Sequence, residues 1–232
     1  MKYKLCDWVP LEKLDWKHLS ANPSPGAVDL LEKNIEKIDW CLLSQNTNAM
    51  SLLERNPEKI VWCYLSANLN DKAIELLEKN FENIDWCLLS QNSNAKAIEM
   101  LEQNPDKINW DMLSANPNAI HLLEQDPELI NWYYLSMNPN DKAIKFLEQN
   151  LDKINWSWLS LNENKNVLHL LLENPDSIHW KYLSSNPSIF KRTGFWVTLK
   201  AVVKLLSLHQ RAVVTANHPL RLLQRGEFNK SD

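Results

Sequence analysis

The chain has 232 residues, a formal net charge of −4 and only 3 Gly beside 11 Trp and 11 Pro. Loops that cradle phosphates need clustered glycines whose backbone amides can approach the ligand, so this composition argues against P-loop, Rossmann and kinase-type nucleotide sites. Residues 1–190 carry 17 Lys and Arg against 27 Asp and Glu, a net charge of −10, which argues against nucleic-acid binding by this part of the chain.

The first ten residues precede the repeats described next and are expected to form an N-terminal cap. They contain no apolar run of the kind found in a signal peptide. No uncharged apolar stretch of the chain approaches the roughly 20 residues that a transmembrane helix needs. The sequence therefore predicts a cytoplasmic protein without a transmembrane segment.

An internal repeat built around tryptophan covers most of the chain. Each repeat Trp is followed by Leu at the third position after it, by Ser at the fourth and by Asn at the sixth, and an aliphatic residue lies two positions before it. A second, Leu-rich block such as Asn118–Glu124 separates one Trp segment from the next. Self-similarity at a fixed period is the signature of a repeat architecture. The eight repeat tryptophans are spaced by 24 or 22 residues and are Trp16, Trp40, Trp62, Trp86, Trp110, Trp132, Trp156 and Trp180.

Both halves of the repeat are predicted to be short helices. Each opens with Asn, a strong N-cap, often followed by Pro, which fits the first helical position. A second possible N-cap, usually Asp or Asn, directly precedes the Trp, so the Trp helix could begin at either place. The difference between 22 and 24 residues is read as an insertion in a turn. Because glycine is almost absent from the repeats, Asn is also expected to occupy the turn positions that need a positive φ.

The predicted fold is all-α: an α-solenoid of about eight stacked short helix pairs over residues 1–190, followed by a basic C-terminal helical cap or tail over residues 191–232. Helices this short are not stable alone in water, so packing between neighbouring repeats must hold them. The repeat tryptophans are predicted to lie in the core, each with its indole N–H bonded to a backbone carbonyl.

No residue pattern indicates catalysis, a cofactor or a metal site. Cys41, Cys63 and Cys87 follow the Trp in three consecutive repeats, but equivalent positions in stacked helices lie about 8–10 Å apart, beyond the limit for a disulfide. They are expected to be free thiols, and no His pair has zinc-ligand spacing. The repeated Ser indicates a cap or turn role in every unit. The sequence therefore predicts a protein that is not an enzyme.

Two columns of acidic residues recur through the repeats. The first is interpreted as a solvated face or, alternatively, as an acidic edge that contacts a partner: Glu32, Glu54, Glu78, Glu102, Glu124 and Glu148. The second is expected in the first turn of the Trp helix, where it meets the positive end of the helix dipole: Glu36, Glu58, Glu82, Asp106, Glu128, Asp152 and Asp176.

Variable positions within a fixed frame are where a solenoid carries specificity. The two positions after the Trp, and the position after the Ser, become richer in aromatic residues and Met toward the C-terminal repeats, and such residues are enriched at interfaces. Leu161 belongs to the same columns. The alternative is partial burial against the C-terminal cap. The candidate partner surface consists of Tyr133, Tyr134, Met137, Trp158 and Tyr182.

The segments Asn104–Trp110 and Leu113–Glu124 resemble the Trp-containing short-repeat proteins that giant DNA viruses of protists encode in many copies, a family without an assigned activity. The resemblance covers residues 10–190 with many columns matching in order, and His218-Pro219-Leu220-Arg221 is similar to an element near the end of those proteins. It implies a viral protein in a host cytoplasm and supplies no catalytic residues. Residues 191–217 depart from the family's terminal element.

The tail carries a net charge of +6 and an apolar stripe formed by Trp196, Leu199, Val203 and Leu206. It is predicted to be a helix that covers the last repeat, with a partner-binding helix or a membrane-surface helix as alternatives. For the whole chain the sequence favours a monomeric, non-enzymatic scaffold that binds an unknown protein partner. The alternative is a structural or assembly component of a virus particle.

Overall fold

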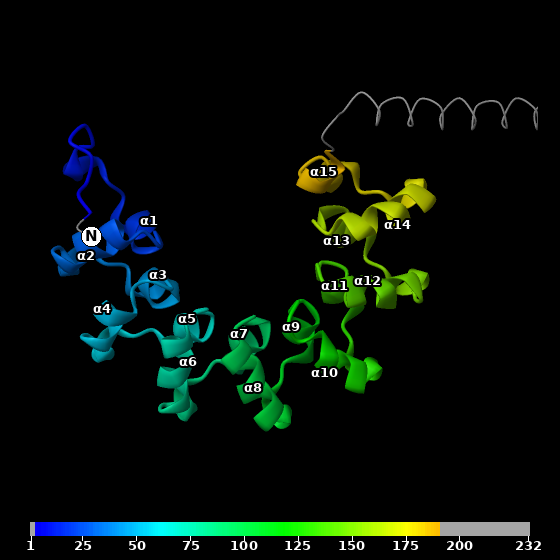
Figure 1. Cartoon of the computed structure of the whole chain (residues 1–232), viewed down its shortest axis with the longest axis horizontal. Coiled ribbons are helices and arrows are strands. Elements are labelled where there is room, and N and C mark those ends of the chain that lie inside the picture. The colour runs from blue at the N-terminus through cyan, green and yellow to red at the C-terminus, as the bar shows by residue number, and fades with distance from the viewer. Residues whose placement is uncertain (1–2, 191–232) are drawn as a thin grey trace, which may run out of the picture. The chain divides into compact units, whose positions relative to one another are not determined.

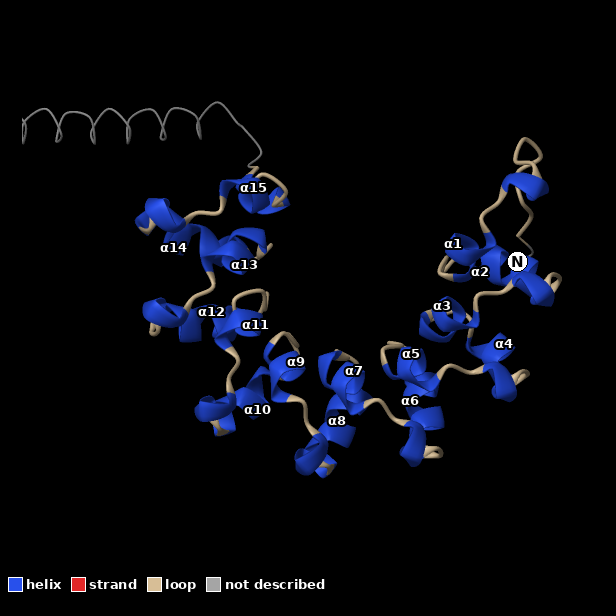
Figure 2. Cartoon of the chain, turned by 180° about the vertical axis from the view of Figure 1, so that it is seen from behind, coloured by secondary structure: helices blue, strands red, loops and turns tan. Residues whose placement is uncertain are grey.

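The computed structural model describes residues 3–190, and within this range it is helical and contains no strand (Figure 2). Met1–Ile189 form one compact unit. In this unit short helices alternate between two rows, which confirms the predicted all-α repeat solenoid. The predicted C-terminal cap, residues 191–232, lies outside the described residues.

One row contains the eight Trp helices, each of which begins at a repeat Trp (Figure 1). They are α1 (Trp16–Ser20), α3 (Trp40–Gln45), α5 (Trp62–Ser66), α7 (Trp86–Gln91), α9 (Trp110–Ser114), α11 (Trp132–Leu135), α13 (Trp156–Leu161) and α15 (Trp180–Leu183). The second row contains α2 (Pro25–Glu32), α4 (Met50–Glu54), α6 (Asp71–Glu78), α8 (Ala95–Gln103), α10 (Ile120–Gln125), α12 (Asp141–Glu148) and α14 (Leu168–Glu173). Both views place this second row on the outer side of the curved stack within the unit.

A single 3₁₀ turn precedes every Trp helix, and the Asn-Pro segments that begin at Asn56, Asn104 and Asn174 fall there. These turns are Leu11–Lys13, Ile35–Lys37, Pro57–Lys59, Phe81–Asn83, Pro105–Lys107, Pro127–Leu129, Leu151–Lys153 and Pro175–Ser177, and two more lie at Lys165–Val167 and Pro187–Ile189. The helix itself is capped by the residue just before the Trp: the Asp85 side chain, for example, accepts the Leu88 N–H. Only Val61 among these cap positions lacks a side-chain acceptor. The second of the two predicted N-caps is therefore the one that starts the Trp helix. The second acidic column lies in the 3₁₀ turn, not in the first turn of the Trp helix as predicted.

The prediction that Asn supplies positive φ angles is wrong. Asn34 and Asn80, which end second-row helices, have φ of −137° and −132°. Their amides donate to the carbonyls of Leu30 and Leu76, four residues earlier, at 2.9 and 2.8 Å. Asn closes these helices by donating from its side chain, so φ stays negative and no left-handed residue is needed.

The core runs continuously through the stack, and in the six inner repeats its most buried position is the Leu three residues after the Trp, whereas Leu19 and Leu183 of the end repeats are half-buried. Leu43, Leu65 and Leu89 are fully buried. The tryptophans are half-buried and pack against this core from its edge, apart from Trp180, which is 65% exposed. Among residues 3–190 no indole N–H donates to a carbonyl, so the predicted indole–carbonyl bonds are absent from this part of the chain.

Successive repeats are joined by hydrogen bonds from the repeated Ser and Asn. Each repeat Ser Oγ donates to the carbonyl of its own Trp and, in every repeat but the last, accepts the N–H of the residue before the next Trp, as Ser90 does with Trp86 and Asn109. The Asn two residues later donates its amide to two carbonyls of the preceding repeat at 2.8–3.2 Å. We call these donors the asparagine ladder: Asn46, Asn68, Asn92, Asn116, Asn138, Asn162 and Asn186, all at most 5% exposed. Because buried carbonyls need partners, the ladder satisfies backbone groups that the short helices leave open.

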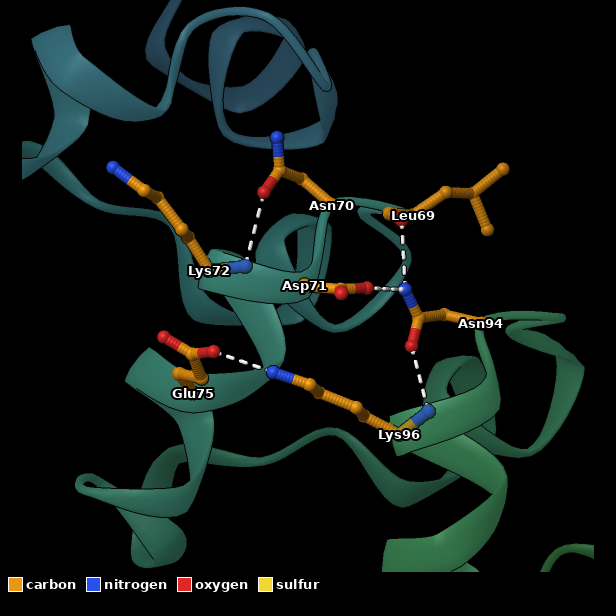
Figure 3. Close-up of polar contacts among 7 residues, drawn as sticks. All are labelled: Leu69, Asn70, Asp71, Lys72, Glu75, Asn94 and Lys96. Atoms are coloured by element: carbon orange, nitrogen blue, oxygen red, sulfur yellow. Dashed lines mark hydrogen bonds and ion pairs between the residues drawn. The ribbon is translucent and has the colours of Figure 1, made fainter.

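A second row of amides crosses the same interfaces nearer the surface. In Figure 3 the Asn94 amide donates to the Leu69 carbonyl at 2.9 Å and to the Asp71 carboxylate at 2.7 Å, while its own oxygen caps α8 at the Lys96 N–H. The equivalent donors are Asn48, Asn70, Asn118, Asn140 and Asn164. In each case the later repeat donates and the earlier repeat accepts.

A candidate protein-binding surface on the C-terminal repeats

The five residues predicted as a partner surface come from three successive Trp helices and the turn after one of them. Tyr133 and Tyr134 lie on α11, Trp158 on α13 and Tyr182 on α15, while Met137 lies just after α11. Stacking places equivalent positions of neighbouring repeats side by side. Tyr133 and Tyr182 are exposed, and the other three are half-buried.

The structure brings the four aromatic residues into one continuous row, which we call the aromatic strip. The Tyr133 ring meets Tyr134 edge to face at 5.3 Å between centroids, and it meets Trp158 in the same way at 5.7 Å. Trp158 in turn stacks with Tyr182 of the next repeat at 6.5 Å with an interplanar angle of 16°. Such aromatic pairs are favourable beyond the area they bury, so the strip is held in place before any partner binds.

A shallow hollow of about 270 Å³ lies beside the strip. It is lined by Met137, Pro139, Trp158, Leu161, Asn162 and Glu163. The Asn162 amide belongs to the asparagine ladder, and the Glu163 carbonyl accepts a hydrogen bond from the Ser188 hydroxyl. The walls of the hollow are therefore mostly apolar and its floor is fixed by bonds between repeats. Met137, the predicted surface residue outside the strip, contributes here next to Trp158.

His179 is a member of this surface that sequence reasoning missed. Its ring stacks on Tyr182 at 4.0 Å, and its Nδ1 accepts the Tyr182 N–H at 3.3 Å, which caps α15. The signal was present in the sequence, because His179 is the only His at a position that is otherwise Asp, Asn or Val. This cap holds the backbone of Tyr182 in place at the end of the strip.

The same columns in the earlier repeats carry different chemistry. Cys41, Cys63 and Cys87 are half-exposed free thiols, and Cys6 is an exposed one. Tyr64 is the only aromatic residue in these columns before α11, and it is 37% exposed, the same fraction as Tyr182. In residues 3–190 no group of three or more His, Cys, Asp or Glu side chains could hold a metal ion.

The first acidic column is engaged within the solenoid. Five of its six residues pair with a basic side chain of the following repeat: Glu32 with Arg55, Glu54 with Lys72, Glu102 with His121, Glu124 with Lys142 and Glu148 with His169. The hydrogen bond from Arg55 lowers the pKa of Glu32. Exposed pairs of this kind contribute little stability, but they leave few acidic groups here for a partner.

None of the helices within residues 3–190 is long and apolar enough to cross a membrane. Comparison with known protein families, with curated proteins and with solved structures found no match to this chain.

Proposed function

We propose that the protein is a non-enzymatic scaffold that binds a partner protein through the aromatic strip and the adjoining hollow. The observation that carries the proposal is the contiguity of Tyr134, Tyr133, Trp158 and Tyr182 across three repeats. Aromatic residues dominate binding energy at protein interfaces, and preformed aromatic surfaces lose little entropy on binding. The hollow suits one apolar side chain of the partner, with Trp158 as its wall.

Two further features support a binding role over a catalytic one. The Ser and Asn side chains that might carry chemistry recur in every repeat and serve inter-repeat hydrogen bonds. The columns around the strip, in contrast, change from one repeat to the next. The resemblance to repeat proteins of giant viruses extends the proposal to a viral protein acting in host cytoplasm.

An assembly role in a virus particle is the second candidate, favoured by the single direction of the bonds between repeats.

The test compares the partners retained by the full chain and by matched variants. Tyr133→Ala, Trp158→Ala and Tyr182→Ala remove parts of the surface, whereas Tyr64→Ala makes the same change at an equally exposed, equivalent position outside it. Quantitative affinity capture should give proteins bound by the wild type and by Tyr64→Ala but lost with Trp158→Ala. Calorimetry with the purified partner should then reproduce the loss. An identical set of bound proteins for all variants would refute the proposal.

A further inference from the structure

The bonds between repeats all run in one direction, and this makes the two ends of the solenoid unit chemically different. In every interface the later repeat donates its Asn amides and the N–H before its Trp, and the earlier repeat accepts with carbonyls and the Ser hydroxyl. The ion pairs of the outer helices follow the same rule, with the base on the later repeat. One end should therefore present donors and the other end acceptors.

The N-terminal end presents the donors. Asn22 stands at the ladder position of the first repeat but is exposed, and its amide donates to nothing among residues 3–190. In later repeats the N–H of the residue before the Trp donates to the Ser Oγ of the preceding repeat. The corresponding N–H of Asp15 has no acceptor in this range. Asn22 lines a hollow of about 470 Å³ whose walls include Tyr3, Leu5 and Leu19. The hollow thus combines apolar walls with an amide donor.

The C-terminal end presents the acceptors. Ser184 is exposed, and within residues 3–190 neither its Oγ nor its carbonyl accepts a hydrogen bond from a later repeat. From the described residues, the Asn186 carbonyl receives only a long bond, 3.5 Å, from the Ile189 N–H. Apolar surface accompanies these acceptors: Trp180 is 65% exposed, and Leu172, at a position that holds Glu in earlier repeats, is 75% exposed.

Inside the stack the same groups meet in every interface. Seven times a Ser-x-Asn turn of one repeat lies against the Asn amide of the next. The following repeat also covers the preceding Trp, as Lys37 does over Trp16 and Lys153 does over Trp132. The partner that best complements each end is therefore the opposite end of the same unit.

We propose that copies of this chain associate head to tail: the Ser184-Ser185-Asn186 turn of one copy docks in the hollow beside Asn22 of the next. Such a contact is heterologous, so both molecules of a pair keep one unused end and further copies can add, giving an open chain or a closed ring of more than two copies. This association uses the turn that follows Tyr182 but none of the rings of the aromatic strip. It differs from the monomer expected from sequence, and it competes with the predicted C-terminal cap, residues 191–232, for the same end of the solenoid. It gives the assembly role a physical basis.

The test uses the full chain and one variant blocked at each end. Asn22→Asp replaces the amide donor by a carboxylate that repels carbonyls while still accepting the Ser24 N–H. Ser184→Arg places a long charged side chain on the docking turn. Asn83→Asp and Ser51→Arg make the same changes in charge and size in the middle of the stack and serve as matched controls. Circular dichroism checks that each variant is folded.

Sedimentation velocity over a wide concentration range gives the readout. The wild type and both controls should grow in mass with concentration and pass beyond the dimer. Each end-blocked variant should stay monomeric, and an equimolar mixture of the two should form dimers and stop there, because only one intact head and one intact tail remain. A wild type that is monomeric throughout or stops at a dimer, or folded end-blocked variants that assemble like the wild type, would overturn the proposal.

Discussion

Substitution of one asparagine of the ladder, Asn116, by Ala should destabilise the solenoid far more than the same substitution at Asn22, the corresponding residue of the first repeat. Asn116 is fully buried, and its amide donates to the carbonyls of Ser90 and Asn92 at 3.0 and 2.9 Å. Its side-chain oxygen accepts the Asn118 N–H at 3.1 Å. Asn116→Ala therefore removes the partner of three backbone groups at once.

The magnitude follows from the cost of leaving those groups without partners. A buried polar group that loses its hydrogen bond costs about 1–3 kcal/mol. Water can enter the space that the side chain leaves and satisfy part of the loss, so we expect about 3–5 kcal/mol for the three groups together. Asn22→Ala loses only the exposed bond with the Ser24 N–H and should cost less than about 1 kcal/mol.

Urea denaturation of both variants, at protein concentrations low enough to keep the chain monomeric, measures the difference. The m-value must be compared as well, because a broken interface in a repeat array can let the two sides unfold separately, which lowers m. Similar losses of stability in Asn116→Ala and Asn22→Ala would refute the reasoning, since the two differ in whether an earlier repeat accepts from the amide.

Four further substitutions test other parts of the structure. Leu113→Ala should cost about 2–5 kcal/mol and Trp110→Ala no more than this despite its larger ring, because Leu113 is fully buried and Trp110 is half-buried; urea denaturation compares them. Val61→Asp should raise stability by roughly 1 kcal/mol in the same assay by supplying the missing N-cap of α5. Arg55→Ala should raise the pKa of Glu32 toward its ordinary value of 4.5, as followed by NMR titration. Since the folded-state pKa of Glu32 is lowered, the stability from this pair is present above pH 4.5 and is lost as pH falls through the folded value, and the variant should lack that dependence.

The helix pairs could be predicted because their determinants are local. A single repeat already shows the spacing of Trp, Leu, Ser and Asn and the cap residues. The helices of the structure begin and end where these residues predict. The aromatic strip was also accessible, because stacking brings equal columns of neighbouring repeats together. Once the solenoid is inferred, Tyr133, Trp158 and Tyr182 must lie in adjacent layers.

The role of the repeated Ser and Asn was not accessible in the same way. A turn or cap role predicts hydrogen bonds only to residues nearby in the sequence. The Asn116 amide instead donates to carbonyls 24 and 26 residues earlier. The positive φ expected for Asn failed for a related reason: the side chain can donate to a carbonyl four residues back, as at Asn34, and this closes the helix without a left-handed residue. The repeat tryptophans lie at the edge of the core and not within it, because the Leu three residues later fills the centre of each inner repeat.

The two repeat lengths show why the ladder and the variable columns can coexist. Asn68, after a 22-residue spacing, and Asn92, after a 24-residue spacing, make the same bonds to the Ser carbonyl of the previous repeat, at 2.8 and 2.9 Å. The two extra residues lengthen the second helix at its start instead of forming a turn insertion, since α6 spans Asp71–Glu78 whereas α4 spans only Met50–Glu54. Every ladder donor and acceptor lies in the segment from Trp to Asn, which keeps a constant length. Changes in the outer helices, or at exposed positions such as Tyr64 and Tyr133, therefore leave the bonds between repeats unchanged. Partner specificity can vary while the interfaces between repeats stay the same.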